Sequence, residues 1–258
     1  MRCAGLDVGS RTIKLVTGNG GGFSAVTVAT GVRPLERCRE LLNGAVYDGL
    51  VVTGYGRLLV AGELGAATVS EIKAHALGAR RLFPDCRSVI DVGGQDCKVI
   101  RLDEAGAVQK FEMNDRCAAG TGKFLEVMAG TLEIELDRLG DLALAAEKEV
   151  KINSLCTVFA ESEVVSLIAR GEAPEAIARG LHEAIAQRIA TMAKRLGLKE
   201  RVVFTGGGAL NPCLVKMLEE KLETPLTVAP DPQTAGALGV CLLAGEIPAK
   251  HNLQAVAV

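Results

Sequence analysis

The feature that most constrains the fold of this chain is an internal repeat. Residues 6–14 (LDVGSRTIK) and 90–98 (IDVGGQDCK) align without gaps, and each copy runs from a short apolar stretch through glycine into aliphatic residues. That pattern is typical of a β-hairpin with a glycine turn. Two such hairpins predict a duplicated α/β architecture of two lobes with a cleft between them. Four identities hold the register: Asp7/Asp91, Val8/Val92, Gly9/Gly93 and Lys14/Lys98.

The segments around the repeats alternate between strand-like and helix-like patterns, which favours the α/β class. We predict strands at 50–53 and 201–205, a helix capped by Ser70, a helix over 122–130, a helix over 174–196 ended by Gly197, and a helix from Pro212. We expect residues 1–84 plus 232–258 to form lobe I, and residues 85–231 to form lobe II.

Composition excludes several classes of function. The 29 Lys and Arg residues nearly balance the 31 Asp and Glu residues, so we expect no nucleic-acid surface and no binding to an anionic membrane. No apolar run approaches the roughly 18 residues of a membrane-spanning helix. The first residues, MRCAGLD, carry an acid and a glycine where a signal peptide is apolar. We therefore expect a cytoplasmic protein whose eight cysteines are reduced thiols.

Three glycine-rich turns are candidate nucleotide-binding loops, because backbone amides at glycine approach phosphate oxygens closely. An ordinary tight turn is the alternative for each loop taken alone. Asp7 and Asp91, at the strand ends, are placed to hold a hydrated Mg²⁺. The predicted phosphate contacts are Gly9, Ser10, Arg11, Thr12 and Lys14 in the first loop, and Gly93, Gly94 and Gln95 in the second. Gly206, Gly207 and Gly208 form a third turn that suits adenine, and no P-loop sequence occurs.

Two cysteines differ from the other six in their surroundings. Cys117 lies in a polar, small-residue loop that runs into a helix, and Cys156 lies at another junction between a loop and a helix. A thiolate gains stability at a helix N-terminus from free amides and the helix dipole. We expect the other six to be small buried core residues: Cys3, Cys38, Cys86, Cys97, Cys213 and Cys241.

No C-x-x-C sequence occurs, which argues against zinc knuckles and ferredoxin-type ligation within one chain. Two thiolates cannot complete a cubane that needs four. A two-fold symmetric dimer would supply the missing pair and place one cluster on its axis. Plain packing of Cys117 and Cys156 stays open as the alternative.

The three loops resemble the motifs of the actin-like ATPase superfamily, which includes acetate and sugar kinases, actin and heat-shock chaperones. Residues 6–14 look like its first phosphate motif, residues 90–98 its second, and residues 202–211 its adenosine motif. The segment 70–76 is similar to its connecting helix, which implies that Glu71 orients the attacking water. A first-turn Glu that complements the helix dipole is the alternative. Asp7, Glu71, Asp91 and Gln95 are thus the candidate catalytic residues, and Gly122 and Gln233 complete the predicted cofactor contacts.

Residues 111–129 and 156–166 resemble the signatures of ATP-dependent activators of 2-hydroxyacyl-CoA dehydratases, and the similarity runs from Leu6 to about Leu243. The resemblance implies an oxygen-sensitive homodimer in which Cys117 and Cys156 of each subunit bind one shared 4Fe–4S cluster. It also implies that ATP hydrolysis drives a low-potential electron to a partner enzyme, with reduced ferredoxin or flavodoxin as the donor.

Three alternatives stay open at this point. A close relative would serve a benzoyl-CoA reductase or a double-cubane cluster protein instead of a dehydratase. A small-molecule kinase would share the fold, although no acceptor-binding motif is evident. A nucleotide-gated scaffold or chaperone would use Cys117 and Cys156 only for packing.

Overall fold

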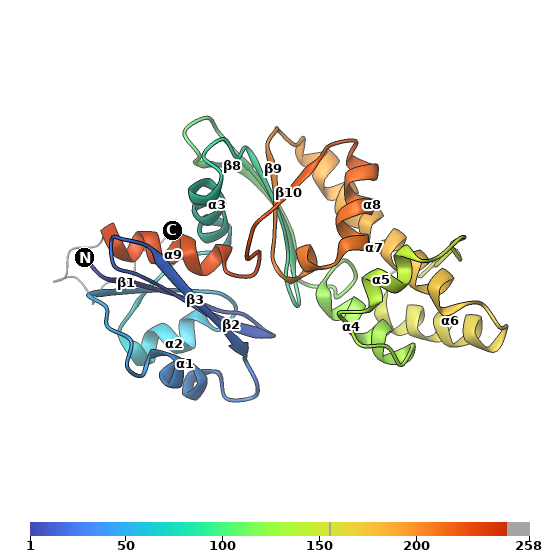
Figure 1. The fold of residues 1–258 in the computed structure, drawn as a ribbon, viewed down its shortest axis with the longest axis horizontal. Coiled ribbons are helices and arrows are strands. Elements are labelled where there is room, and N and C mark those ends of the chain that lie inside the picture. The colour runs from blue at the N-terminus through green and yellow to red at the C-terminus, as the bar shows by residue number, and fades with distance from the viewer. Residues whose placement is uncertain (155, 247–258) are drawn as a thin grey trace. The chain divides into compact units, whose positions relative to one another are not determined.

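The computed structural model describes residues 1–154 and 156–246, which form two five-stranded sheets (Figure 1). The first sheet has the order β3 (Phe23–Ala29), β2 (Thr12–Gly18), β1 (Cys3–Val8), β4 (Gly49–Thr53), β5 (Ala67–Thr68). The second has the order β10 (Leu226–Val228), β9 (Val202–Thr205), β6 (Ser88–Val92), β7 (Cys97–Leu102), β8 (Val108–Asn114).

Both sheets have the same topology, because the second order read backwards matches the first strand for strand. In each sheet the two repeat strands pair antiparallel, as β1–β2 and β6–β7. The first repeat strand also pairs in parallel with a later strand, as β1–β4 and β6–β9. The predicted hairpins and the duplication of the α/β unit are therefore confirmed.

The first unit comprises Met1–Cys86, Leu102–Gln109 and residues 229–246. The predicted residues 247–258 of lobe I lie outside the described part of the chain. The helices of the first unit are α1 (Pro34–Leu42), α2 (Arg57–Leu64), α3 (Glu71–Leu82) and α9 (Ala235–Glu246). Alternate residues of β1 face opposite sides of the sheet. Leu6 packs with the core that includes residues of α1 and α2, whereas Cys3 packs with residues of α3 and α9.

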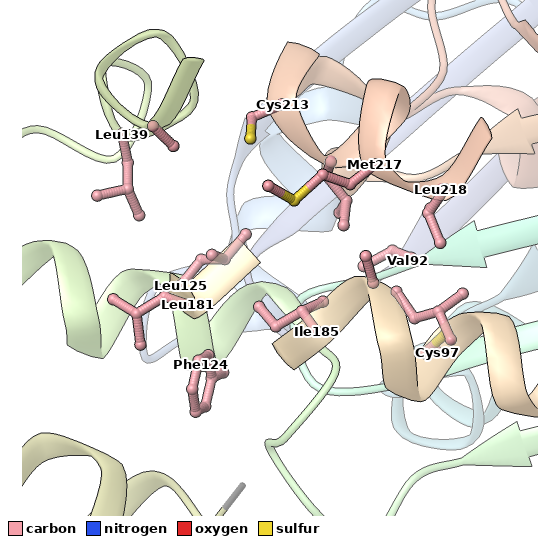
Figure 2. Close-up of a cluster of buried hydrophobic side chains, with 14 of the residues drawn as sticks. Val92, Cys97, Phe124, Leu125, Leu139, Leu181, Ile185, Cys213, Met217 and Leu218 are labelled. Carbon is pink, nitrogen blue, oxygen red and sulfur yellow. The ribbon is translucent and has the colours of Figure 1, made fainter. Parts of the chain in front are cut away.

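The second unit comprises Arg87–Arg101 and Lys110–Val228. Its helices are α4 (Gly122–Thr131), α5 (Leu139–Leu144), α6 (Thr157–Ala169), α7 (Pro174–Leu196) and α8 (Pro212–Leu222), with a 3₁₀ turn, η1 (Gly207–Leu210). Along the described chain, four helices (α4–α7) separate β8 from β9. In the first unit only α1 separates the matching strands β3 and β4. Ile185 of α7 and Met217 of α8 pack with Val92 in its core (Figure 2).

Several helix ends follow the predicted chemistry. The Ser70 hydroxyl accepts a hydrogen bond from the Lys73 amide at the start of α3. Gly197 ends α7 in the left-handed conformation, with φ of 73°. Pro212 opens α8, where its missing amide hydrogen costs nothing. Within the described residues, no helix combines the length and the apolar character that crossing a membrane requires.

Candidate functional site

A buried Asp–Lys pair lies at the first predicted phosphate loop. Asp7 of β1 faces Lys14 of β2 in the cross-strand register, and Lys14 Nζ lies 3.3 Å from Asp7 Oδ2. The loop between them is closed by a hydrogen bond from the Gly9 amide to the Thr12 carbonyl at 3.1 Å. Thr30 donates through its hydroxyl to the Gly9 carbonyl at 2.8 Å. The pair fixes the carboxylate at the end of β1, beside the loop.

The second loop repeats this geometry. Asp91 of β6 faces Lys98 of β7, whose Nζ lies 3.2 Å from Asp91 Oδ2 and 2.8 Å from Asp96 Oδ2. The Gly93 amide donates to the Asp96 carbonyl at 2.9 Å, which matches the Gly9 bond of the first loop. Thr205 donates through its hydroxyl to Asp91 Oδ1 at 3.1 Å. The repeat therefore preserves an ion pair as well as a hairpin.

A second repeated element, which the sequence analysis did not identify, is a left-handed glycine that follows a strand in each unit. Gly54 follows β4 with φ of 95°, and a Cβ there would lie 2.6 Å from Asp7 Oδ1. Gly206 follows β9 with φ of 82°, and a Cβ there would lie 2.6 Å from Asp91 Oδ1. Only glycine fits both the conformation and the contact. The signal was present in the sequence, since TGYG at 53–56 matches TGGG at 205–208.

The second phosphate loop is hydrogen-bonded to the start of helix α4. The Gly122 amide donates to the Gly93 carbonyl at 2.9 Å, and the Lys123 amide donates to the Gly94 carbonyl at 2.8 Å. These are two of the amides that a helix leaves without internal partners at its N-terminus. A Cβ on Gly122 would lie 3.1 Å from the Gly93 carbonyl oxygen. Gly122, predicted as a cofactor contact, is thus placed against the loop and its amide is engaged there.

The loop that carries Cys117 leads directly into this helix. Asn114 donates through its side-chain amide to the carbonyls of Cys117 at 2.9 Å and Ala119 at 2.8 Å. Cys117 is half-buried and precedes the first residue of α4 by several positions. The sequence pattern suggested that Cys117 lies at a helix N-terminus. The structure instead places it before a turn, formed by Ala119 and Gly120, that separates it from the helix.

An unusual arginine lies under the same loop. A Cβ on Gly120, which has φ of 86°, would lie 3.1 Å from Arg188 Cδ. The Nε atom of Arg188 is buried without a hydrogen-bond partner among the described residues. A buried donor without an acceptor is uncommon in folded proteins. The side chain therefore brings a positive charge and an available donor to the base of the Cys117 loop.

Cys156 occupies the N-cap of α6 and is exposed. The backbone before it is held by Glu163, one of whose oxygens lies 3.0 Å from the Asn153 amide and the other 3.0 Å from the Ser154 amide. Burial by itself raises the pKa of Glu163, but the hydrogen bonds from Asn153 and Ser154 outweigh it, so the pKa lies below its ordinary value. The Glu163 carboxylate thus holds the backbone of Asn153 and Ser154 in place, a role that the sequence pattern did not indicate.

The remaining cysteines are buried, as predicted from their apolar surroundings. Figure 2 shows Cys97 and Cys213 within the apolar core of the second unit. Burial raises the pKa of Cys38 and of Cys213 to about 11, so both stay protonated thiols at neutral pH. In residues 1–154 and 156–246, no three His, Cys, Asp or Glu side chains gather as a possible metal site.

The adenosine motif ends at Asn211, which contacts a buried histidine. Asn211 caps α8 by accepting from the Leu214 amide at 3.0 Å, and its side-chain amide lies 2.8 Å from His182 Nε2. His182 Nδ1 lies 2.7 Å from the Ala178 carbonyl oxygen. Nδ1 must therefore donate and Nε2 accept, which a neutral imidazole satisfies. Burial lowers the pKa of His182 below its ordinary value.

The predicted site residues fall into two sets, one in each unit. Glu71 begins α3, and His75 follows one turn later. His75 lies close to Gly236, because a Cβ on Gly236 would lie 2.9 Å from His75 Nε2 and 3.5 Å from Asp7 Oδ2. The first set lies in the first unit: Asp7, Gly9, Ser10, Arg11, Thr12, Lys14, Glu71 and Gln233. The second lies in the second unit: Asp91, Gly93, Gly94, Gln95, Cys117, Gly122, Cys156, Gly206, Gly207 and Gly208.

Known proteins resemble this chain over nearly its whole length. It is 43% identical over 260 residues to the activator of lactoyl-CoA dehydratase from Anaerotignum propionicum, covering 97% of this chain and 100% of that one. It is 33% identical over 260 residues to a benzoyl-CoA reductase subunit from Thauera aromatica, covering 93% and 91%. The structure of the activator of 2-hydroxyisocaproyl-CoA dehydratase from Clostridium difficile, with bound ADPNP, matches with a TM-score of 0.89 and 38% identity over 100% of both chains.

These matches confirm the predicted actin-like ATPase fold, with its two mixed sheets in two α/β lobes. They also confirm the resemblance to dehydratase activators, which are relatives at about 40% identity. The pattern of the BadF/BadG/BcrA/BcrD ATPase family matches residues 4–244. The chain belongs to the BadF/BadG/BcrA/BcrD ATPase family.

Proposed function

We propose that this protein is a cytoplasmic, homodimeric activase that couples ATP hydrolysis to the transfer of one low-potential electron. Its acceptor is a 2-hydroxyacyl-CoA dehydratase-type enzyme, and its donor is reduced ferredoxin or flavodoxin. Cys117 and Cys156 of each subunit hold one shared 4Fe–4S cluster. When bound, the cluster supplies the one-electron chemistry, and the residues of the chain bind nucleotide and position the cysteines.

The observation that carries this proposal is the direct link between the second phosphate loop and helix α4. Gly93 and Gly94 accept the amides of Gly122 and Lys123, which end the loop that holds Cys117. A shift of the phosphate loop on nucleotide binding would therefore displace the start of α4 and the Cys117 loop with it. A two-state element that a ligand biases in this way is what coupling requires.

The residues around the two cysteines suit an anionic cluster. Cys156 sits at the N-cap of α6, where free amides and the helix dipole stabilise the negative charge of a cluster. Arg188 brings a positive charge and a buried, unpaired Nε to the base of the Cys117 loop. Hydrogen bonds and charges near the sulfurs tune cluster potential. By contrast, burial raises the pKa of Cys38, Cys97, Cys213 and Cys241, so these thiols favour the neutral form.

An exposed apolar face on α6 supports the homodimer. Val158 and Phe159 are 67% and 66% exposed, and Val165 and Ile168 follow on the same helix with 54% and 44% exposure. The first of these, Val158, lies two residues after Cys156. Several exposed large apolar side chains on one helix are typical of an interface, and a two-fold contact there would bring together two copies of Cys156.

The two Asp–Lys pairs suit the phosphates and a hydrated Mg²⁺. Lys14 holds Asp7 and Lys98 holds Asp91 at the ends of β1 and β6. Mg²⁺ keeps several of its waters, so a carboxylate reaches the ion through water without giving up its lysine partner. Glu71, the first residue of α3, would orient the attacking water, and Gly207 would lie against the adenine.

The dehydratase partner is favoured over a benzoyl-CoA reductase by the comparisons. The dehydratase activators are 39–43% identical to this chain, whereas the benzoyl-CoA reductase protein is 33% identical. A double-cubane cluster protein is the other acceptor of the same chemical kind. The rate at which this protein, supplied with dithionite and ATP, reduces each of the three purified acceptors would show which acceptor it prefers.

The cluster assignment is tested by iron analysis of protein purified without oxygen. Wild-type protein should carry about four irons per dimer, because a cubane has four. Cys117→Ser and Cys156→Ser should each lose nearly all of that iron and keep ATP binding. Cys38→Ala is the matched control, since Cys38 is buried in the first unit, and it should keep the wild-type iron content.

Two outcomes would overturn the assignment. Iron-free protein that hydrolyses ATP would favour a kinase or a nucleotide-gated scaffold of the same fold. Full iron content in either serine variant would mean that the altered cysteine is not a ligand.

A further inference from the structure

Two buried cysteines outside the cluster loops lie in contact with each other. The sulfurs of Cys3, the first residue of β1, and Cys241, in α9, are 3.0 Å apart. That separation exceeds a disulfide bond by only about 1 Å. The two residues lie at opposite ends of the described sequence, yet both belong to the first unit.

The backbone around the pair is held close by glycine. A Cβ on Gly5 would lie 2.3 Å from the Cys241 amide nitrogen, so α9 packs directly on β1 at this level. Gly5 is on the same face of β1 as Cys3, because side chains alternate along a strand. A Cβ on Gly18, opposite Cys3 on β2, would lie 2.9 Å from the Cys3 sulfur. The tight packing keeps both sulfurs facing each other.

The two thiols form a hydrogen-bond chain. The Cys3 thiol donates to the Gly18 carbonyl at 3.6 Å, which leaves the Cys3 sulfur to accept from the Cys241 thiol. Burial, followed by the contact with Cys3, raises the pKa of Cys241. A protonated thiol is a poor nucleophile, so Cys241 stays reduced until a strong oxidant reaches it.

We propose that Cys3 and Cys241 are a disulfide-forming site that fastens α9 to β1 when the protein meets a peroxide. Hydrogen peroxide takes two electrons from the thiols: one sulfur attacks an oxygen, the O–O bond breaks, and a sulfenic acid and water form. The second sulfur then displaces the hydroxyl as a second water, and the S–S bond forms. Both thiol protons end in water, and a dithiol reductant reverses the reaction.

The bond would act on the nucleotide-binding unit. It closes a loop that runs through almost the whole chain, and a longer loop removes more freedom from the unfolded state. At its N-terminal end α9 carries Gly236, which lies beside Asp7 of the first phosphate loop. The disulfide would therefore hold the strand and helix around Asp7 together under oxidation. This inference does not depend on the cluster.

The test treats full-length, anaerobically purified protein with hydrogen peroxide, then blocks free thiols with N-ethylmaleimide in denaturant. Non-reducing peptide mass spectrometry should find the Cys3 peptide joined to the Cys241 peptide, and dithiothreitol should separate them. Oxidised wild type should unfold at least about 5 °C above the reduced protein. Cys241→Ala should show neither effect, and the control Cys38→Ala should show both.

Two results would overturn the inference. One is N-ethylmaleimide on both Cys3 and Cys241 after a peroxide dose that has already oxidised Cys117 and Cys156. The other is a cross-link that leaves the unfolding midpoint unchanged. Iron content, measured on the same samples before oxidation, tests the proposed function separately, because the cross-link involves no cluster ligand.

Discussion

Glu163 shows how one side chain can position a neighbouring residue, here the proposed cluster ligand Cys156, through the backbone. Its carboxylate accepts hydrogen bonds from the backbone amides of Asn153 and Ser154, so the chain entering Cys156 is fixed from helix α6 itself. Asn114 does the same for the Cys117 loop through two carbonyls. Such outer contacts set ligand orientation and retention in metal sites generally.

Removal of the charge on Glu163 should loosen the Cys156 loop. Glu163→Gln keeps the size of the side chain but weakens the two charge-assisted bonds to backbone amides. We expect the cluster to be lost about tenfold faster to a chelator, with ATP affinity unchanged. Glu161→Gln, on an exposed position of the same helix, is the control. Equal rates of iron loss in the two variants would contradict a role for Glu163.

His182 should make stability fall on the acidic side of neutrality. Its pKa is lowered by burial in the folded protein and returns to about 6.5 on unfolding. Above pH 6.5 both states are neutral and the histidine costs nothing. Below it the unfolded state binds a proton that the folded state refuses, so the free energy of unfolding decreases by up to about 1.4 kcal/mol per pH unit.

Urea unfolding between pH 7.5 and 5 (about two and a half units, spanning the ordinary histidine range) measures this slope. His182→Gln does not titrate, so its slope should be shallower than that of wild type by up to the contribution of one proton. Superimposable slopes would mean that His182 binds its proton equally well in the folded and unfolded states.

At the scale of elements, the contact between helix α4 and the second phosphate loop is the central one. Its two hydrogen bonds use helix N-terminal amides that would otherwise need water or a capping side chain. Thr121, the N-cap residue, makes no side-chain cap and donates instead to the Ala118 carbonyl. The loop, the turn and the helix are therefore joined by hydrogen bonds.

Gly122→Ala should weaken this contact with minimal other change. The added Cβ would lie 3.1 Å from the Gly93 carbonyl oxygen and would push the loop from the helix. Loss of a hydrogen bond worth about 1 kcal/mol corresponds to about a fivefold weaker response to ATP. The readout is the ATP-induced change in the electron paramagnetic resonance spectrum of the reduced cluster.

Gly130→Ala is the matched control, because Gly130 lies near the other end of α4 and a Cβ there meets nothing within 4 Å. Both variants add one methyl group to a glycine of α4, so a difference between them reports the contact with Gly93. An unaltered spectral response in Gly122→Ala, at full iron content, would remove this contact from the coupling path.

Elements with a strong local pattern were predictable from the sequence. The helix over 174–196 has regular apolar spacing, a proline at its start and a glycine at its end, and the structure gives the same bounds. Helix α9 was not predicted, because Ala235–Glu246 is apolar on all sides and shows no amphipathic period. Its pattern reflects burial against β1 and α3, which only the tertiary structure reveals.

The candidate site likewise contains parts that a local sequence pattern predicts and parts that only tertiary packing determines. The two phosphate hairpins carry their own signal in the repeat, and so do the left-handed glycines once TGYG and TGGG are compared. The contacts of Gly122 with Gly93 and of Glu163 with Asn153 join segments whose spacing follows no motif. They arise from how the four helices that follow β8 in the chain pack within the second unit, and sequence periodicity holds no information about that packing.

At the scale of the whole molecule, duplication has produced two similar units with different additions. Both keep the hairpin, the Asp–Lys pair and the left-handed glycine. Only the second carries helices α4–α7 between its third and fourth strands, and with them both cysteine loops. One chain offers two thiols on these loops, which is half of what a cubane needs.

Native mass spectrometry of anaerobically purified protein measures whether two copies of this chain share one cluster. One species should dominate, a dimer whose mass includes four irons and four sulfides, and cluster-free protein should replace it in Cys156→Ser. A cluster carried by a monomer, or two clusters in a dimer, would contradict the shared site.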